Sequence, residues 1–210
     1  ECGPAVGSAD AGVRGITPDL PGHGDGAKPH DPAAYPPDAL ARDAETLIGH
    51  LGLTDYDLGG YSLGARTTVR VLARGIAPAP RRVILSGLGD EGVVDTGRRA
   101  GYFRNVLTRF GSFVRGDREF MAQAFLKTTG GDPQALLGIL DTFVDTPREA
   151  VAKIDLPVLI VAGDEDDEVR SFEGLAAMLP DARLVSIPGN HMSAVTRSEL
   201  GEAIVAFLTA

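Results

Sequence analysis

Short apolar runs alternate with longer segments of helical periodicity along most of this 210-residue chain. Such alternation is typical of parallel strands joined by crossover helices, because a parallel neighbour needs a connection that returns the chain to the same edge. The predicted strands are VRGITPDL at 13–20, YDLGGY at 56–61, RRVILSG at 81–87, PVLIVAG at 157–163 and ARLVSIPG at 182–189. The predicted helices fall between or after these strands, at 38–52, 63–75, 171–179 and 193–208. We therefore expect an α/β fold with a doubly wound, mostly parallel sheet.

Residues 91–153 show no strand pattern. Apolar side chains recur there at helical spacing, among them Phe103, Phe110, Phe120 and Leu136. We interpret this stretch as a helical cap insertion in a sheet domain formed by residues 1–90 and 154–210. A single core of this kind suits the length of the chain, since one domain commonly uses about 100 to 200 residues.

Composition and charge exclude several classes of function. The formal net charge is −9 and no basic stripe is present, which argues against nucleic acid as a partner, because phosphate binding depends on lysine and arginine. The single cysteine, Cys2, rules out an intrachain disulfide, a thiolate zinc cluster and a Cys-x-x-Cys redox pair. No apolar run approaches the roughly 18 residues of a membrane span, and the first residues lack the features of a signal peptide. We expect a cytoplasmic protein that binds neither membranes nor nucleic acid; the sequence carries no signal for an oligomeric state.

Candidate catalytic residues follow three of the predicted strands. Ser62 comes directly after one strand, a run of five acids at 164–168 follows another, and His191 follows the last. Ligands of parallel sheets bind beyond the carboxyl ends of the strands, so side chains at these three points can meet. A serine hydroxyl becomes a nucleophile when a histidine accepts its proton and an acid orients that histidine. The order serine, acid, histidine therefore points to acyl-transfer chemistry.

Gly60, Ser62 and Gly64 fit the pattern G-x-S-x-G, in which the serine occupies a strained turn between a strand and a helix. We expect crowding to require both glycines, because a β-carbon two residues to either side of the serine would collide with the neighbouring backbone. The turn also places Ser62 at a helix N-terminus. There the amide of Leu63 is predicted to donate a hydrogen bond to the oxyanion of the reaction.

The sequence resembles the α/β-hydrolase superfamily, and in particular its compact capped esterases, over residues 13–210. The resemblance rests on GYSLG, PVLIVAGDED and IPGNH in this order, together with the earlier segment GITPDLPGHGDGAKP. It implies an α/β-hydrolase fold with Ser62 as the nucleophile and His191 as the base. It also implies that Asp166, three residues after Gly163, is the acid.

Two features qualify this resemblance. Asp90 is the alternative acid, because it follows the predicted strand at 81–87 and some family members carry the acid there. The family also places an HG loop, which donates the second oxyanion hydrogen bond, one strand and one helix ahead of the PDLPGHG element. Only eighteen residues precede Asp19, and none of them forms this motif. We therefore expect this stretch to lack the second donor, and the working protein to carry a further strand.

Together, the residues and the resemblance predict a serine hydrolase that cleaves a carboxylic ester of a small to medium substrate through an acyl-enzyme. This chemistry needs no cofactor and no metal ion. The same triad supports C–C bond hydrolysis, thioester cleavage, lactone opening and perhydrolysis as alternatives. A noncatalytic binding protein with the hydrolase fold is an alternative of another class.

Three other sequence features give weak or no evidence of a binding site. GLGDEG at 87–92 fits the dinucleotide pattern G-x-G-x-x-G, but the next predicted strand begins only at 157, which is too far for a nucleotide-binding βαβ unit. The acids at 164–168 lack the D-x-D-x-D-G spacing of a calcium-binding loop. The remaining histidines are interpreted as loop or surface residues: His23, His30 and His50.

Overall fold

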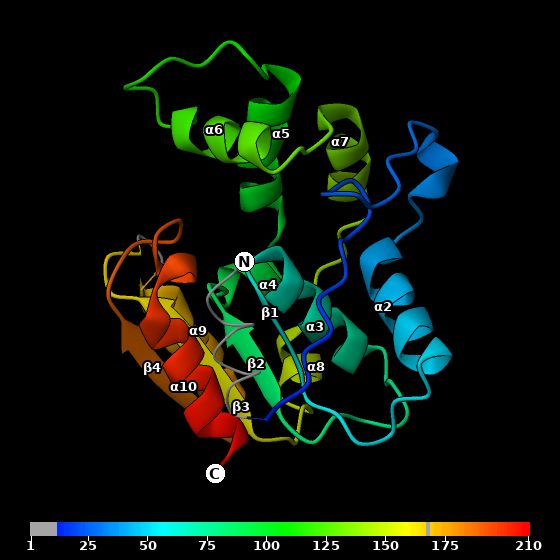
Figure 1. Cartoon of the computed structure of the whole chain (residues 1–210), viewed down its shortest axis with the longest axis vertical. Helices are drawn as coiled ribbons and strands as arrows, with labels where there is room; N and C mark the ends of the chain where they lie inside the picture. Colours follow the sequence, from blue (N-terminus) through cyan, green and yellow to red (C-terminus); the bar gives the residue numbers. More distant parts are fainter. Residues whose placement is uncertain (1–11, 167–168) are drawn as a thin grey trace. The chain divides into compact units, whose positions relative to one another are not determined.

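A computed structural model describes residues 12–166 and 169–210. Its four strands lie side by side as one parallel sheet in the order β1–β2–β3–β4 (Figure 1). They are β1 (Leu58–Tyr61), β2 (Val83–Ser86), β3 (Val158–Gly163) and β4 (Ala182–Ile187). The predicted α/β fold with a parallel sheet is confirmed, and four of the five predicted strands form.

Helices connect these strands and make up most of the remaining regular structure. Those that precede, connect or follow the sheet strands along the chain, outside residues 91–153, are α2 (Ala39–His50), α3 (Leu63–Ala73), α9 (Val169–Met178), the 3-10 helix η2 (Ala194–Thr196) and α10 (Ser198–Leu208). Residues 91–153 contain α4 (Glu91–Val94), α5 (Gly97–Thr108), α6 (Phe120–Thr128), α7 (Pro133–Asp141) and α8 (Arg148–Val151). A short 3-10 helix, η1 (Pro32–Ala34), precedes α2. The predicted helical character of residues 91–153 is therefore observed, with no strand of the sheet in that stretch.

The two inner strands of the sheet, β2 and β3, are buried on both faces, which explains why they read as continuous apolar runs. On one face, alternate side chains of β2 and β3 pack against α3 and α9. This cluster includes Val83, Leu85, Val158, Ile160, Val69, Phe172 and Leu175. On the other face, the intervening side chains pack against α10, in a cluster that includes Ile84, Leu159, Val161, Leu200 and Phe207. Each fully buried side chain of this size contributes roughly 1.5 to 3 kcal/mol to folding, so the strand ends are held on a rigid support.

The predicted strand at 13–20 is wrong. These residues have no regular secondary structure, and Ile16 is 45% exposed. The apolar positions are few and are interrupted by Gly15 and Pro18, and proline cannot donate to a strand ladder. The apolar residues of the segment were therefore too weak a signal for a strand.

The chain separates into two compact units. The first, called the sheet unit below, comprises the described residues among 12–16, Ala44–Asp95 and Asp145–Ala210. The second unit comprises Thr17–Asp43 and Thr96–Val144. The division predicted from the sequence, with 1–90 and 154–210 as the sheet domain and 91–153 as the insertion, differs from these units chiefly in the segment 17–43.

Within the second unit, an apolar cluster joins α5, α6 and α7 through Val106, Leu107, Leu126, Leu136 and Leu140. The segment 17–43 packs on α7. A β-carbon on Gly138 of α7 would lie 2.5 Å from the Tyr35 ring, and the Asp38 amide donates to the Thr142 carbonyl at 2.9 Å. These contacts explain why two segments distant in the sequence form one unit.

Candidate active site

Ser62, His191 and Asp166 lie together in the sheet unit. The Nε2 atom of His191 is 3.1 Å from Oγ of Ser62, although 129 positions separate the two residues in the sequence. On the other side of the ring, Nδ1 is 3.1 Å from Oδ2 of Asp166. Because an ionised carboxylate only accepts, Nδ1 donates to Asp166 and Nε2 is left to accept from the serine hydroxyl. This is the geometry in which a histidine removes the proton of a serine nucleophile.

The parallel sheet creates this meeting point. Tyr61, Ser86 and Val161 are in register on β1, β2 and β3, so β1 and β2 end at one level of the sheet and β3 ends shortly beyond it, at Gly163. Ser62 directly follows β1, and Asp166 comes three residues after the end of β3. Side chains at the carboxyl ends of these strands are therefore close in space, as the sequence analysis expected.

Burial distinguishes the acids at 164–168. The Asp166 side chain is 4% exposed, whereas Asp164 and Glu165 are exposed residues. Asp167 and Glu168 lie outside the described residues. A buried carboxylate is costly unless it is hydrogen-bonded, and the imidazole of His191 meets this need for Asp166.

The backbone of Ser62 adopts φ 52° and ψ −107°, a conformation with positive φ that side-chain-bearing residues rarely take. Its amide donates to the carbonyl of Ser86 on β2 at 2.7 Å, and its carbonyl accepts from the Arg66 amide at 2.9 Å. The strained turn, which costs of the order of 1 to 3 kcal/mol, is thus held between the sheet and the first turn of α3. This agrees with the turn that the G-x-S-x-G pattern predicts.

The two glycines of the pattern play different roles. A β-carbon on Gly60 would overlap the Gly64 backbone and lie 2.6 Å from the Ala65 nitrogen, so crowding does require this glycine. A β-carbon on Gly64 would meet no atom within 4 Å. The expectation that crowding requires both glycines is therefore wrong for Gly64, because its missing side chain would point into open space.

Further hydrogen bonds hold the loop of His191. The Asp164 carboxylate accepts from the Gly189 amide at 2.8 Å, and the Tyr61 hydroxyl donates to the His191 carbonyl at 2.6 Å. Neither residue is distinguished by the sequence alone. Tyr61 is an unspecified position of the G-x-S-x-G pattern, and Asp164 is one of five consecutive acids, so only the three-dimensional contacts distinguish them.

Asp90, the alternative acid, makes a different set of contacts. Its Oδ1 atom accepts from the Ser171 hydroxyl at 2.7 Å, and its Oδ2 atom accepts from Nη2 of Arg148 at 3.2 Å. The structure therefore brings Asp166, and not Asp90, to the imidazole of His191. Asp90 instead ties the chain after β2 to α8 and α9.

Leu63 is the first residue of α3, and its amide is one of the N-terminal amides that have no carbonyl partner within their own helix. Its predicted role as an oxyanion donor follows from this position. The expectation about a second donor concerns residues 1–18, of which 1–11 lie outside the described residues.

The glycines of GLGDEG are explained by packing. A β-carbon on Gly87 would lie 2.7 Å from the Tyr61 ring, and one on Gly89 would overlap Ser171. The helix that follows, α4, has only four residues. The segment thus lacks the long helix on which a dinucleotide-binding turn depends.

The other histidines belong to loops or helix ends, as interpreted from the sequence. Nδ1 of His23 donates to the Pro21 carbonyl at 3.0 Å, and His30 pairs with Asp132 at 3.1 Å. His50 is the exposed last residue of α2. Backbone hydrogen bonds from Ala135 and the contact with His30 hold the pKa of Asp132 below its usual value.

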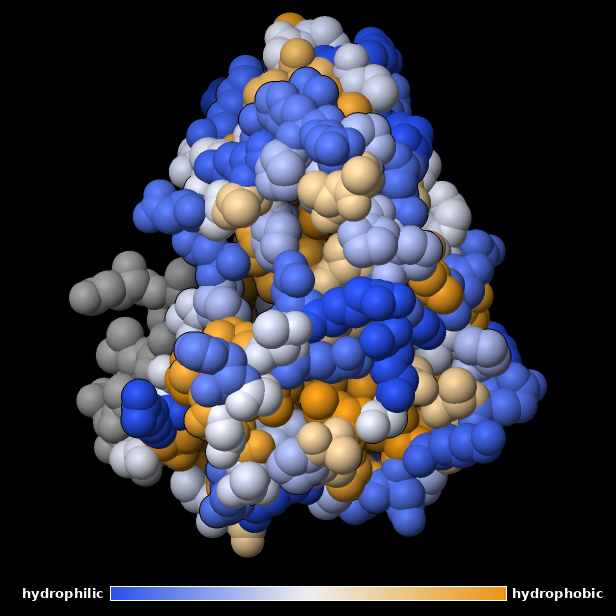
Figure 2. Space-filling view, turned by 90° about the vertical axis from the view of Figure 1, so that its right-hand side faces the viewer, coloured by the Kyte–Doolittle hydropathy of each residue, from blue (hydrophilic) through white to orange (hydrophobic). Residues whose placement is uncertain are grey.

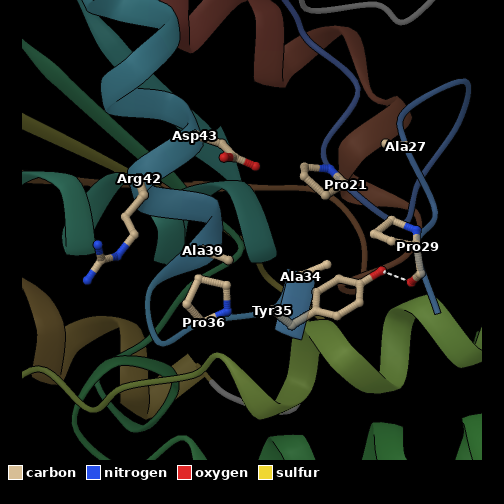
Figure 3. A pocket seen from close by; sticks show the side chains of 9 residues that line it. All are labelled: Pro21, Ala27, Pro29, Ala34, Tyr35, Pro36, Ala39, Arg42 and Asp43. Carbon is tan, nitrogen blue, oxygen red and sulfur yellow. Dashed lines mark hydrogen bonds between the residues drawn. The ribbon is translucent and has the colours of Figure 1, made fainter. Parts of the chain in front are cut away.

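A cavity of about 220 Å³ lies entirely within the segment 17–43 of the second unit (Figure 3). Its lining residues are Pro21, Ala27, Pro29, Ala34, Tyr35, Pro36, Ala39, Arg42 and Asp43. The Tyr35 hydroxyl donates to the Pro29 carbonyl at 2.6 Å, and loss of surrounding water raises the pKa of the Asp43 carboxyl. Neither Ser62 nor His191 lines this cavity, so it contains none of the predicted catalytic groups.

The part of the chain that the structure describes contains neither a metal-binding cluster nor a membrane-spanning helix. Among residues 12–166 and 169–210, no three histidine, cysteine or acidic side chains are arranged to hold a metal ion. In the same part of the chain, every helix is too short or too polar to cross a bilayer.

Known proteins resemble this chain in sequence. The model of the "Alpha/beta hydrolase family" matches residues 5–203. An N-formylmaleamate deformylase of Pseudomonas putida is 39% identical over 152 residues, which cover 72% of this chain and 52% of that protein. A non-heme chloroperoxidase of Kitasatospora aureofaciens is 28% identical over 210 residues, which cover 86% of this chain and 75% of that protein.

Solved structures share the fold. A thermophilic esterase from Thermogutta terrifontis superimposes with a TM-score of 0.74 at 21% identity, covering 99% of this chain and 83% of that one. At this level of identity the likeness concerns the fold alone. It agrees with the parallel sheet and flanking helices described above.

Proposed function

The chain belongs to the alpha/beta hydrolase family, and on this premise we propose that it cleaves carboxylic esters of small to medium substrates through an acyl-enzyme on Ser62. One observation carries the proposal. The two hydrogen bonds of His191, 3.1 Å to Ser62 and 3.1 Å to Asp166, form a continuous relay at the carboxyl edge of the sheet.

The proposed reaction has two steps. Ser62 Oγ attacks the ester carbonyl while His191 Nε2 takes its proton, and the resulting imidazolium gives that proton to the leaving alcohol. Water then attacks the acyl-enzyme with the same assistance, which releases the carboxylic acid and restores the serine. Asp166 keeps the proton of the neutral imidazole on Nδ1 and stabilises the imidazolium.

The oxyanion of each tetrahedral intermediate needs a donor close to Ser62. The Leu63 amide at the start of α3 supplies one, and the positive end of the helix dipole favours the negative charge there. Removal of one donor of this kind typically costs about 2.7 to 4 kcal/mol. We assign the role to the backbone, so side-chain substitutions at position 63 are expected to affect the rate less than substitutions in the relay.

A second candidate function is hydrolysis of an N-formyl amide. It is favoured by the 39% identity to an N-formylmaleamate deformylase. The same serine attack on a formyl carbonyl would release formate after hydrolysis of a formyl-enzyme. The two candidates share their residues and differ in the leaving group, which is an alcohol in one and an amide nitrogen in the other.

A fluorophosphonate probe and a substrate panel test the proposal. We expect one probe molecule per chain on Ser62, and turnover of p-nitrophenyl esters that falls as the acyl chain lengthens. Ser62→Ala should abolish labelling and lower turnover by about four to six orders of magnitude. A panel of N-formyl amides assayed in parallel distinguishes the second candidate. A Ser62→Ala variant that retains labelling or full turnover would contradict both.

The acid is tested by two matched variants. Asp166→Asn should lower turnover by about four orders of magnitude, because an amide favours the wrong imidazole tautomer. Asp90→Asn is the control, since its carboxylate contacts Ser171 and Arg148, and it should keep turnover within about threefold of the parent. The reverse pattern would assign the acid to Asp90.

A further inference from the structure

We propose that Tyr61 is a positioning residue, whose hydroxyl holds the backbone of His191 so that the imidazole spans Ser62 and Asp166. This inference rests on the proposed function in taking His191 as the base. It adds a residue that neither the sequence pattern nor the proposed mechanism requires.

The position of the Tyr61 ring is fixed by its surroundings. Tyr61 ends β1 in register with Ser86 and packs into the apolar cluster on the α10 face of the sheet. A β-carbon on Gly87 would lie only 2.7 Å from Cζ of the Tyr61 ring, and Gly87 adopts φ 62°. The glycine after β2 therefore leaves the space that the tyrosine occupies, and the ring has little freedom to turn.

The hydroxyl of this fixed ring donates to the His191 carbonyl at 2.6 Å. The two rings also lie near each other, with centroids 5.4 Å apart and planes inclined by 52°. The imidazole must place two nitrogen atoms at once, each 3.1 Å from its partner. A shift of the backbone at this residue would lengthen at least one of these hydrogen bonds, and a displacement of about 1 Å can cost about a hundredfold in rate.

Tyr61 and Asp164 bracket the loop of His191. Asp164 accepts from the Gly189 amide, which ties the loop to the turn after β3. Tyr61 ties the same loop to the end of β1, one residue before Ser62. The residue next to the nucleophile therefore anchors the main chain of the base, so a movement of one is transmitted to the other.

The test compares Tyr61→Phe with Tyr56→Phe. Each variant removes one hydroxyl that donates to a backbone carbonyl in the sheet unit, and the Tyr56 hydroxyl bonds the Pro78 carbonyl at 2.8 Å. For Tyr61→Phe we expect kcat for p-nitrophenyl acetate to fall about tenfold with KM within about twofold, and fluorophosphonate to label Ser62 about tenfold more slowly. Tyr56→Phe should leave kcat and the labelling rate within about twofold of the parent. The two variants should shift the midpoint of urea unfolding by similar amounts, because each loses one hydrogen bond.

A second measurement does not depend on turnover. The ¹⁵N spectrum of labelled histidine reports the tautomer and mobility of each imidazole, and loss of one signal in His191→Gln identifies His191. We expect a single Nδ1–H tautomer in the parent chain and broadened or mixed-tautomer signals in Tyr61→Phe only. Parent-like spectra and rates in Tyr61→Phe, or equal losses in Tyr56→Phe, would overturn the inference. Absence of ester turnover in the parent would contradict the proposed function, while the spectra would still decide the role of Tyr61.

Discussion

At the residue scale, the turn around Ser62 is built by one glycine that is crowded and one that is not. Gly60 is required because its α-hydrogen faces the Gly64 and Ala65 backbone, whereas Gly64 faces open space. The G-x-S-x-G pattern predicted the strained serine correctly but could not separate these roles. Which glycine is crowded depends on how closely the strand and the helix pack against each other. The sequence pattern contains no information about this packing.

Substitution of each glycine by alanine tests this difference. Gly60→Ala should lower the free energy of unfolding by about 3 kcal/mol or more, because a β-carbon there must displace backbone atoms. Gly64→Ala should be neutral or stabilising by up to about 1 kcal/mol, because alanine favours the helix. Urea unfolding of the two variants measures both values, and equal destabilisation would contradict the assignment.

Some residues of the candidate site could be predicted from the sequence and others could not. Ser62 and His191 were predictable because each follows an apolar run that becomes a strand of the parallel sheet. Asp166 required the family spacing, since Asp164 and Glu165 have the same charge and only the structure shows that they are exposed while Asp166 is buried. Asp164 and Tyr61 were missed because their importance lies in backbone contacts across the sheet edge.

At the scale of secondary-structure elements, strands were predicted well where both faces of the sheet are covered. β2 and β3 are buried along their whole length, so their continuous apolar runs were a strong signal. The segment 13–20 contains apolar residues without such burial, and it forms no strand. The last helix, predicted from residue 193, begins at Ser198, because hydrogen bonds within Asn190–Ser193 and the 3-10 helix η2 take up the first residues.

The N-terminus of α7 provides a test that depends on pH. Asp132 caps this helix by accepting from the amides of Gln134 and Ala135. Its pKa is lowered from the usual 3.8, chiefly by the bond from Ala135, so its contribution is complete above that value and is lost as the pH falls through the lowered pKa. We expect Asp132→Ala to cost about 1 kcal/mol at neutral pH and less below pH 3.8.

Asp132→Asn is the control for this prediction. Asparagine caps helices about as well as aspartate, so at neutral pH this variant should lose less stability than Asp132→Ala. Urea unfolding at neutral and acid pH gives the comparison. A difference between Asp132→Ala and the parent that grows toward acid pH would contradict the role of the ionised carboxylate.

At the scale of the whole molecule, division into units was harder to predict than the fold. The boundaries predicted from the sequence assign residues 17–43 to the sheet domain. In the structure this segment instead packs on α7, through Tyr35 against Gly138 and Asp38 against Thr142. Contacts between segments about 100 residues apart leave no periodic pattern in a sequence, so local analysis cannot detect them.

The surface and the total charge lead to a prediction about partners. Hydrophilic side chains surround smaller apolar areas on the face shown in Figure 2, and the formal net charge is −9. We predict no binding to a fluorescein-labelled DNA duplex at low ionic strength with protein up to about 10 µM. Proteins that bind DNA phosphates nonspecifically do bind under these conditions. Fluorescence anisotropy measures this directly, and saturable binding that weakens with added salt would contradict it.

The relay and its described supports come from the four strands, the loops after β1, β3 and β4, and the first turn of α3, whereas residues 96–144 leave the sheet unit after α4 and return ahead of α8. Because this segment begins and ends outside those loops, a change in its length or sequence does not break the hydrogen bonds around the imidazole. Related proteins can therefore differ in this segment and still share the arrangement of Ser62, His191 and Asp166.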